Sequence, residues 1–472
     1  MKKLITIVLC ASLALSLFGC HKTRERSKTS KETKGSNQET AVESSDSQMD
    51  EPLTLYYVNN NQHKGVTMLL GWYRSQKDAI KVEAIAFESV QELEKALEGE
   101  EQPDLIMLDK LSGSTQSDPF MWIREGKIAG LNYFMNDDET FEAANYIAGT
   151  LEAGIYEDEQ YILPLSISNQ YLVVNEEELD SGVLSALGGG YTTKQLMEEL
   201  IHDAEAHEGE TYFTTIPFYY DLAGKGAWVY DMLELTGALH VDHMNGGVKI
   251  DAEMFGQTME YMSTLVDDAN LLYTGAADLS NLDFVDMEGY CTVVLTDRNA
   301  PYMTRYMNSA CRQLLQQEMT ILPYALPEGG YAVNVNVMGM VGAGSDQQEE
   351  AYQVLRDMMD VPKEKWETIN ADDTFVQMSS VNRNVALGLL ESFLVMDVGN
   401  FRILGSVIQR EPLTEQQGEI LRDMIENNQC AYITDANIVS AIESYVLPNV
   451  GLENVDWTEI AQQTAQAIEN GM

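Results

Sequence analysis

Three short apolar runs near the start of the chain decide its fold class: LTLYYV at 53–58, KVEAIAF at 81–87 and DLIML at 104–108. Each run has the length and the residue types of a β-strand. The segments between them, 64–75 and 90–97, have the apolar spacing of amphipathic helices. Strands that alternate with helices in this way predict an α/β fold that begins with a parallel sheet.

Polar residues follow the first and third of these strands. In a parallel sheet the ligand crevice lies beyond the carboxyl ends of the strands. Asn59 and Asn61 come after the first strand, and Asp109 comes after the third. We therefore expect these side chains to contact a ligand. The alternative is local, because asparagines also make turns and an aspartate also caps the turn that follows it.

Further along the chain, strands and helices continue to the end. The residue patterns predict strands at 161–166, 171–175, 290–295, 319–322 and 332–341, and helices at 193–207, 227–236, 252–267 and 347–360. From Glu415 onward the pattern is almost wholly helical.

Composition and charge exclude several classes of protein. The chain has 472 residues, 44% of them hydrophobic, which is enough to fill more than one core. It carries 29 Lys and Arg against 75 Asp and Glu, for a net charge of -46. Nucleic acids are bound largely through cations that meet phosphates. We therefore expect no nucleic-acid partner.

The first 20 residues have the pattern of an export signal. Lys2 and Lys3 precede an apolar run from Leu4 to Phe18, which is short for a membrane span. The run ends in Leu17-Phe18-Gly19-Cys20, which resembles a bacterial lipobox. This resemblance implies that residues 1–19 are removed and that Cys20 carries a lipid. The alternative is an ordinary secretory signal with an incidental cysteine.

Residues 20–52 have the composition of a disordered tether, with no aromatic residue. The part from His21 to Lys34 holds six Lys or Arg and two Glu, and it can meet anionic lipid head groups. The part at 35–52 holds five acidic residues and no basic one. A lipid, a tether and an acidic body predict a protein anchored on the extracellular face of the cell membrane.

The sequence contains no motif that indicates catalysis or a cofactor. It has no Gly-x-Ser-x-Gly elbow, no Walker loop and no His-Glu-x-x-His. The run His240-Val241-Asp242-His243 holds three potential metal ligands, fewer than the four of a structural zinc site. We expect no catalytic residue, no metal and no cofactor. Cys291, Cys311 and Cys430 are predicted to be buried, with at most one disulfide among them.

Several ordered segments resemble one known family. They are PDLIML at 103–108, GKIAGL at 126–131, YILPL at 161–165, EGYCTVV at 288–294 and SSVNR at 379–383. In this order they resemble the extracellular solute-binding proteins of ABC importers, in the carbohydrate-type, maltose-binding-protein-like branch. The resemblance is patchy but covers nearly all of 53–472.

The resemblance implies a two-lobed α/β fold of the type II periplasmic-binding-protein kind. Each lobe would be a sheet flanked by helices, and the C-terminus would be rich in helix. We expect lobe 1 to comprise 53–168 and 326–362, and lobe 2 to comprise 169–325 and 363–472.

The resemblance also implies a function without chemistry. Such a protein captures a small ligand, most readily a sugar or oligosaccharide, by closing its lobes, and delivers it to ABC permease subunits and, through them, an ATPase. We expect a monomer that is not an enzyme.

Aromatic and polar residues near the expected cleft are candidate ligand contacts. Trp228 can stack on a sugar face or pack in a core. Asp297 and Arg298 follow a strand, where Arg298 can grip a carboxylate or hydroxyl pair, or the two can form a surface ion pair. Tyr302 and Tyr171 complete the set, although a tyrosine on a crossing strand is often structural.

Other functions stay open. A surface glycoside hydrolase or a polysaccharide-binding lipoprotein would need an acid pair in a cleft or a β-rich body. A binding protein for peptides or amino acids is a further alternative, which Arg298 keeps open. A membrane sensor would need a transmembrane helix, and no later stretch is apolar for 18 residues.

Overall fold

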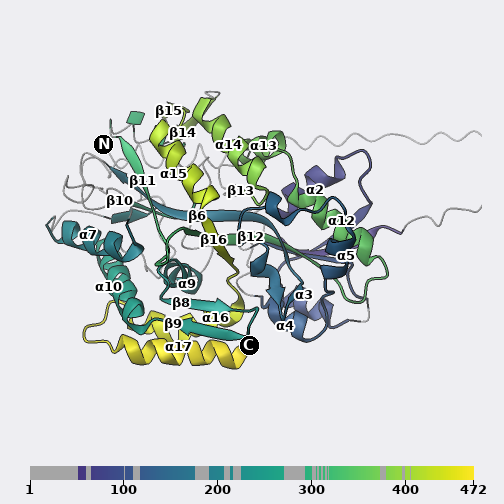
Figure 1. Ribbon diagram of the computed structural model, residues 1–472, viewed down its shortest axis with the longest axis horizontal. Coiled ribbons are helices and arrows are strands. Elements are labelled where there is room, and N and C mark those ends of the chain that lie inside the picture. Colours follow the sequence, from purple (N-terminus) through teal and green to yellow (C-terminus); the bar gives the residue numbers. More distant parts are fainter. Residues whose placement is uncertain are drawn as a thin grey trace, which may run out of the picture. The chain divides into compact units, whose positions relative to one another are not determined.

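The computed structural model describes residues 51–59, 65–99, 101–109, 117–175, 191–206, 213–215, 225–269, 293–299, 305, 308–309, 312–313, 316, 318–372, 379–395, 399–403 and 406–472 (Figure 1). The signal segment, the tether up to residue 50 and the predicted residues Cys20, Asn61 and Tyr302 lie outside the described residues.

The strands are β1 (Leu53–Val58), β2 (Val82–Phe87), β3 (Leu105–Asp109), β4 (Ile155–Tyr156), β5 (Glu159–Gln160), β6 (Leu163–Asn175), β7 (Phe213–Thr215), β8 (Leu239–Asp242), β9 (Gly247–Ile250), β10 (Val293–Asn299), β11 (Met319–Pro323), β12 (Tyr331–Val341), β13 (Ser379–Ser380), β14 (Asn400–Ile403), β15 (Ser406–Gln409) and β16 (Asn428–Tyr432).

The α-helices are α2 (Gly65–Arg74), α3 (Val90–Leu97), α4 (Pro119–Arg124), α5 (Asn132–Asp137), α7 (Thr193–Ala206), α9 (Lys225–Leu235), α10 (Ala252–Ala269), α12 (Gln348–Met359), α13 (Lys363–Asp372), α14 (Arg383–Val395), α15 (Glu415–Glu426), α16 (Ala436–Ala441) and α17 (Trp457–Gly471). Short helical turns are η3 (Ala143–Asn145), η4 (Glu152–Gly154), η7 (Ile442–Val446) and η8 (Leu447–Asn449).

The main sheet has ten strands in the described part of the chain. Its order is β2-β1-β3-β12-β6-β10-β7, with β11 and β13 also paired to β6 and β16 paired to β12. Strands β1, β2 and β3 are parallel, which confirms the α/β start that the sequence predicts. The long strands β12 and β6 are antiparallel to each other. In addition, β12 is antiparallel to β3, and β6 is antiparallel to β10. The sheet is therefore mixed.

Strand β6 joins two parts of the sheet. Its first half, from Leu163 to Asn169, pairs with β12, and its second half, from Tyr171 to Asn175, pairs with β10 and β11. The sequence predicts two strands here, separated by a polar segment. They form one 13-residue strand, roughly 40 Å long at about 3.3 Å per residue. The sheets expected in the two lobes are therefore hydrogen-bonded into one.

Local sequence explains where several helices begin. Ser89 caps α3 by accepting a hydrogen bond from Glu92 N, and Asp118 caps α4 by accepting one from Met121 N, with Pro119 as the first helical residue. Thr414 and Gln417 form a reciprocal capping box at the start of α15. These caps satisfy backbone N–H groups that the helices themselves leave open.

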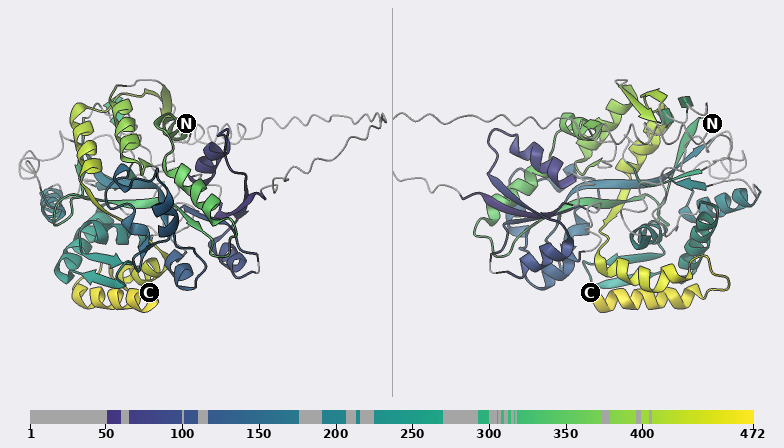
Figure 2. Two further views of the ribbon diagram at one scale, coloured as in Figure 1. Left: turned by 45° about the vertical axis from the view of Figure 1, so that its right-hand side comes forward. Right: turned by 180° about the vertical axis from the view of Figure 1, so that it is seen from behind.

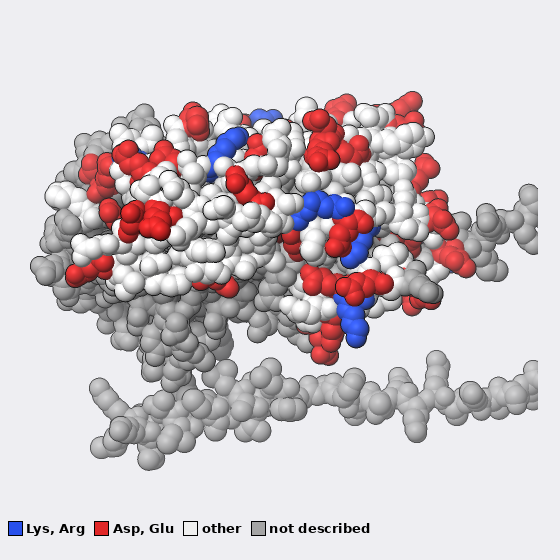
Figure 3. All heavy atoms as spheres, turned by 90° about the horizontal axis from the view of Figure 1, so that it is seen from below, with Lys and Arg blue, Asp and Glu red and all other residues white. Residues whose placement is uncertain are grey.

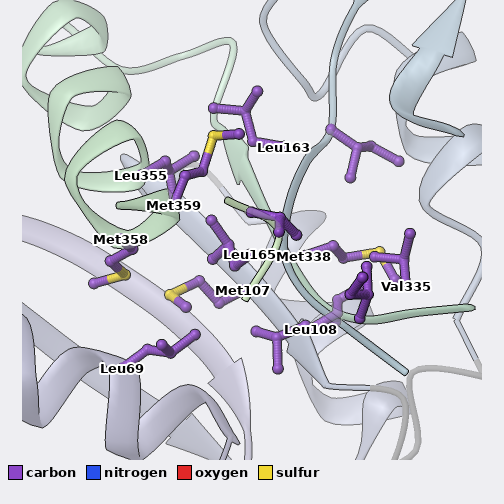
Figure 4. Packing of buried hydrophobic residues seen from close by; sticks show 14 of the residues in the cluster. Leu69, Met107, Leu108, Leu163, Leu165, Val335, Met338, Leu355, Met358 and Met359 are labelled. Atoms are coloured by element: carbon purple, nitrogen blue, oxygen red, sulfur yellow. The ribbon is translucent and has the colours of Figure 1, made fainter. Parts of the chain in front are cut away.

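A first hydrophobic cluster fills the space on either side of β3. All five residues of β3 are buried, and they pack with side chains of α2, α12 and β6. In Figure 4, Met107, Met338, Met358 and Met359 interleave with the surrounding leucines. Methionine is flexible enough to fill irregular gaps in a core, which accounts for its frequent use here.

A second hydrophobic cluster lies at the other end of β6. It is formed by side chains of α9, α10, α16 and α17 with one face of β6 and the hairpin β8–β9. Helices α14 and α15 lie on the opposite side of β6 from α9 and α17 (Figures 1 and 2), and their buried residues belong to the first cluster.

The predicted lobe boundaries stay predictions. The sequence assigns all of 363–472 to lobe 2, and the packing divides this range. Leu389, Leu390 and Leu421 lie in the first cluster, whereas Ile438 and Ala461 lie in the second. "Lobe 1" and "lobe 2" below mean the parts of the chain that build the first and the second cluster.

Candidate functional site

A row of polar side chains crosses the sheet between the two clusters. It consists of Ser166, Ser168 and Gln170 on β6 and Asn334 and Asn336 on β12, and we refer to these five residues as the polar stripe. Each is at most 2% exposed. Further along the same face of β6, Leu172 and Val174 enter the second cluster. The stripe therefore marks the point where the apolar lining of this face stops.

Strand register brings the stripe together. Ser168 lies opposite Asn334, and Asn334 lies opposite Tyr432 on the far side of β12. Paired residues on neighbouring strands point to the same face of a sheet. Asn336 lies two residues further along β12 and so shares this face, where the Ser168 hydroxyl donates to Asn336 Oδ1 at 3.1 Å.

Two other strands end beside the stripe. β3 and β16 lie on the same side of β12, and they run toward each other, because β3 is antiparallel to β12 and β16 is parallel to it. Asp109 at the end of β3 lies opposite Val337, and Tyr432 at the end of β16 lies opposite Asn334. The carboxyl ends of both strands therefore converge on the middle of β12, where α/β sheets place their ligands.

Helix α9 covers part of the stripe with a carboxylate. Asn334 Nδ2 donates to Asp231 Oδ1 at 2.7 Å, and the Thr434 hydroxyl lies 3.3 Å from the same oxygen. Asp231 is fully buried. The stripe is thus tied to lobe 2 by a buried network that holds Asn334 in one orientation.

Two amide groups of the stripe have spare hydrogen-bonding capacity. Among the described residues, Gln170 Nε2 and Asn334 Oδ1 have no hydrogen-bond partner, although both atoms are buried. Buried polar atoms are rarely left in this state, because the lost bond to water costs about 1–3 kcal/mol. Both atoms, one donor and one acceptor, are available to a hydroxyl-bearing guest.

The structure places Asp109 and Asn59 at strand ends, as the sequence predicts. Asp109 is 4% exposed, and its Oδ2 accepts a hydrogen bond from Gly65 N at 3.0 Å. It therefore caps the start of α2, a helix earlier in the chain, rather than its own following turn. Asn59 donates from its backbone N–H to Phe87 O at 2.8 Å. Their contact with a ligand stays a prediction.

The two predicted aromatic contacts lie in different places. Trp228 is in the second cluster at 4% exposure. It is one helical turn before Asp231, so both residues share a face of α9 beside the stripe. Tyr171 is fully buried in the first cluster and alternates with Gln170 along β6, so it lies on the opposite face from the stripe.

Asp297 and Arg298 are part of β10, and their side chains lie outside the described residues. Their backbone is informative. Thr296 pairs with Tyr171 and Asn299 pairs with Asn169, so Asp297 and Arg298 together oppose Gln170 in a bulge. The bulge places these two residues beside one end of the stripe.

Sequence reasoning missed the stripe itself. With the structure known, a sequence pattern for the β12 part of the stripe can be recognised in Val333-Asn334-Val335-Asn336-Val337, where asparagines alternate with valines. A strand with one solvent-exposed face also alternates. Only the burial of both faces shows that these asparagines are buried polar residues rather than surface residues.

The two histidines near position 240 have partners that are not metals. His240 Nδ1 lies 2.6 Å from Glu234 Oε1, and the Tyr230 hydroxyl donates to Glu234 Oε2 at 3.0 Å. The hydrogen bond to Glu234 raises the pKa of His240. His243 stacks on Phe120 with ring centroids 3.6 Å apart. The described residues contain no group of three or more side chains that could hold a metal ion.

Cys430 is a free thiol that is half-buried, not buried as the sequence predicts, and burial raises its pKa to about 12. It is therefore unreactive at neutral pH. Cys291 and Cys311 lie outside the described residues. Among the described helices, none is long and apolar enough to cross a membrane.

Among the charged side chains on the face shown in Figure 3, Asp and Glu are more widespread than Lys and Arg. A surface hollow between β11 and α15 is also acidic, with Glu318, Glu415 and Glu419 in its wall. It contains none of the stripe residues.

Comparison with solved structures supplies the fold. The sugar-binding protein MalE from Xanthomonas citri superposes with a TM-score of 0.59 at 11% identity, covering 89% of this chain and 98% of that one. The cyclic α-maltosyl-1,6-maltose binding protein from Arthrobacter globiformis gives 0.54 at 14% identity, covering 89% and 99%.

An ABC substrate-binding protein from Listeria monocytogenes, in complex with cycloalternan, gives a TM-score of 0.52 at 14% identity and covers 89% of this chain and 98% of that one. No protein-family model and no curated protein matches the chain. The chain has the two-lobed type II fold of periplasmic binding proteins, which confirms the fold expected from its sequence.

Proposed function

We propose that the protein is an extracellular receptor that captures a neutral sugar or oligosaccharide on the polar stripe, between its two lobes. The observation that carries this proposal is the pair of buried amide atoms, Gln170 Nε2 and Asn334 Oδ1, that have no partner among the described residues. A sugar hydroxyl both donates and accepts, so one hydroxyl can serve either atom.

The chemistry around the stripe favours an uncharged polar guest. Asp231 and Asp109 are buried acids beside it, and a buried carboxylate repels an anionic ligand. Trp228 shares the helix face of Asp231, and its indole ring is a suitable partner for the apolar face of a sugar. Asn59, Asn61, Asp297, Arg298 and Tyr302 are proposed as further contacts.

The structural neighbours support binding rather than catalysis. Of the proteins named above, one forms a complex with cycloalternan, one is a cyclic α-maltosyl-1,6-maltose binding protein and one is a sugar-binding protein. We propose the same here: ligand favours the closed arrangement of the lobes, and a permease reads that arrangement. ABC permease subunits and an ATPase would then move the ligand across the membrane.

A thermal-shift screen of the purified protein tests the proposal. The panel contains neutral mono- and oligosaccharides, acidic sugars, amino acids and short peptides. A ligand that binds only the native state raises the melting temperature, by an amount that grows with its concentration. We expect a neutral oligosaccharide to raise the melting temperature most.

Two results would overturn the proposal at different levels. A shift by peptides or amino acids alone would remove the carbohydrate assignment but leave a receptor. Release of reducing ends from a glycan by the purified protein would show a glycoside hydrolase, and the receptor assignment itself would be wrong.

A further inference from the structure

A second contact joins the two lobes beside the end of β16, where residues 431–438 pass from the first cluster to the second. Phe120 on α4 is fully buried in the first cluster, and His243 lies in the turn between β8 and β9, whose strands belong to the second cluster. Their rings stack with centroids 3.6 Å apart and an interplanar angle of 4°.

Two hydrogen bonds flank this stack, and each crosses between the lobes. Ala436 N, at the start of α16, donates to Ser117 O at 2.9 Å, and Arg124 Nη2 donates to Gly471 O at 3.0 Å. Ser117 and Arg124 bracket α4, whereas Ala436 and Gly471 belong to lobe 2. One short helix of lobe 1 therefore makes three separate contacts with lobe 2.

The stack is surrounded by buried polar groups. Asp118 and Asp435 are the capping residues of α4 and α16, and His243 Nε2 lies 3.6 Å from Asp435 Oδ2. Neither ring nitrogen of His243 has a hydrogen-bond partner among the described residues. No hydrogen bond from a ring nitrogen offsets the burial of this imidazole. Its stacking on the ring of Phe120 therefore accounts for its position.

We propose that Phe120, His243, Arg124 and the Ser117–Ala436 hydrogen bond form a clasp that holds the lobes closed over the polar stripe. Every stripe residue is at most 2% exposed, so a ligand reaches it only when the lobes separate. Separation of the lobes at this contact breaks the stack and the hydrogen bond from Arg124 to Gly471, and it exposes Phe120. The clasp thereby sets how often the stripe opens. This inference rests on the proposed function, because it concerns access to the proposed site.

Amide hydrogen exchange of the ligand-free protein tests the clasp. The informative amide is that of Ala436, because its acceptor, Ser117 O, belongs to the other lobe. We expect His243→Ala to speed exchange at Ala436 by about fivefold, since an aromatic stack contributes about that much to an equilibrium. His243→Phe keeps a flat ring against Phe120, and exchange should stay at the wild-type rate.

Two controls separate the clasp from a general loss of stability. His202→Ala removes an exposed histidine from α7 and should leave Ala436 unchanged. The amide of Leu172, within the buried strand β6, should exchange at the same rate in every variant. Equal exchange at Ala436 in His243→Ala and wild type would overturn the clasp, as would faster exchange at both Ala436 and Leu172. No ligand enters this experiment, so its failure is distinct from failure of the proposed function.

Discussion

Asn334 is the residue on which the proposed site depends most. Its Nδ2 donates to Asp231 at 2.7 Å, which fixes the orientation of the side chain. The unpaired Oδ1 therefore points in one direction. Replacement by alanine removes the acceptor and releases Asp231. We expect Asn334→Ala to weaken binding of the sugar with the largest thermal shift by about three- to tenfold, the usual worth of one hydrogen bond. Calorimetric titration measures this.

The control for Asn334 is the same substitution on an exposed helix. Asn384 lies at the start of α14 and is exposed. Asn384→Ala should leave the dissociation constant unchanged. Unchanged affinity in Asn334→Ala, with the variant folded at the assay temperature, would remove Asn334 from the site.

Asp435 makes stability depend on pH. Burial, followed by the facing carboxylate of Asp118, raises the pKa of Asp435 to about 7. An unfolded aspartate releases its proton near pH 4, so between about pH 4 and pH 7 the native state holds a proton that the unfolded state has lost. Stability therefore falls as the pH rises through this window. Asparagine caps a helix equally well and has no proton to lose.

We expect Asp435→Asn to gain stability over the wild type by on the order of 2 kcal/mol between pH 5 and pH 8. Burial lowers the pKa of the neighbouring His243 to about 3, so its contribution is lost as the pH falls below its ordinary value. Arg124 also faces Asp435. His243 and Arg124 are present in both proteins, so the difference between the two proteins reports Asp435 together with the Asp118 carboxyl that faces it. Parallel denaturation curves at the two pH values would contradict the raised pKa.

At the scale of elements, local patterns predicted most of the fold. β1 and α3 have the bounds that the sequence predicts, and α2, β2, β3 and α12 differ by a residue at one or both ends. These elements have strong apolar periodicity and are flanked by residues typical of turns and helix ends. Two of the missed features share a cause: β16 and the strands of the β8–β9 hairpin are only four or five residues long, so only their pairing partners define them. Helices α13 and α14 were also missed, although they are ten and thirteen residues long.

The site was harder to predict than the fold. Asp109 could be proposed as a candidate because it comes at the end of a strand, and a strand's end can be seen in a sequence. Ser168 and Asn334 are 166 residues apart and meet only through the register of β6 with β12. Register is a long-range property that no window of one sequence contains.

Gly342 is the glycine that lets β12 end against β3. A Cβ atom there would lie 2.0 Å from Pro103 O, a backbone atom that cannot move aside. We expect Gly342→Ala to destabilise the fold by about 1–3 kcal/mol or more, measured by urea denaturation. Gly71, within α2, has no atom within 4 Å of the place that a Cβ would take, so Gly71→Ala should instead stabilise by about 0.5–1 kcal/mol. Equal stability of the two variants would contradict the packing described here.

At the scale of the whole molecule, the acidic body and the basic segment next to Cys20 fit a protein held at a membrane. We expect Cys20→Ser to abolish incorporation of radiolabelled fatty acid and to move the protein from the membrane fraction into the medium. Lipid incorporation that persists in Cys20→Ser would place the anchor elsewhere. A matched Cys430→Ser variant should keep both the label and the location, because Cys430 is part of the folded body.

The central claim is that the guest lies between the lobes, against the amides of β6 and β12. A crystal structure of the protein with the neutral oligosaccharide that raises its melting temperature most tests this claim directly. The account predicts sugar hydroxyls within hydrogen-bonding distance of Gln170 Nε2 and Asn334 Oδ1. A sugar bound elsewhere, such as in the acidic hollow beside α15, with these two amides still unpaired, would contradict it.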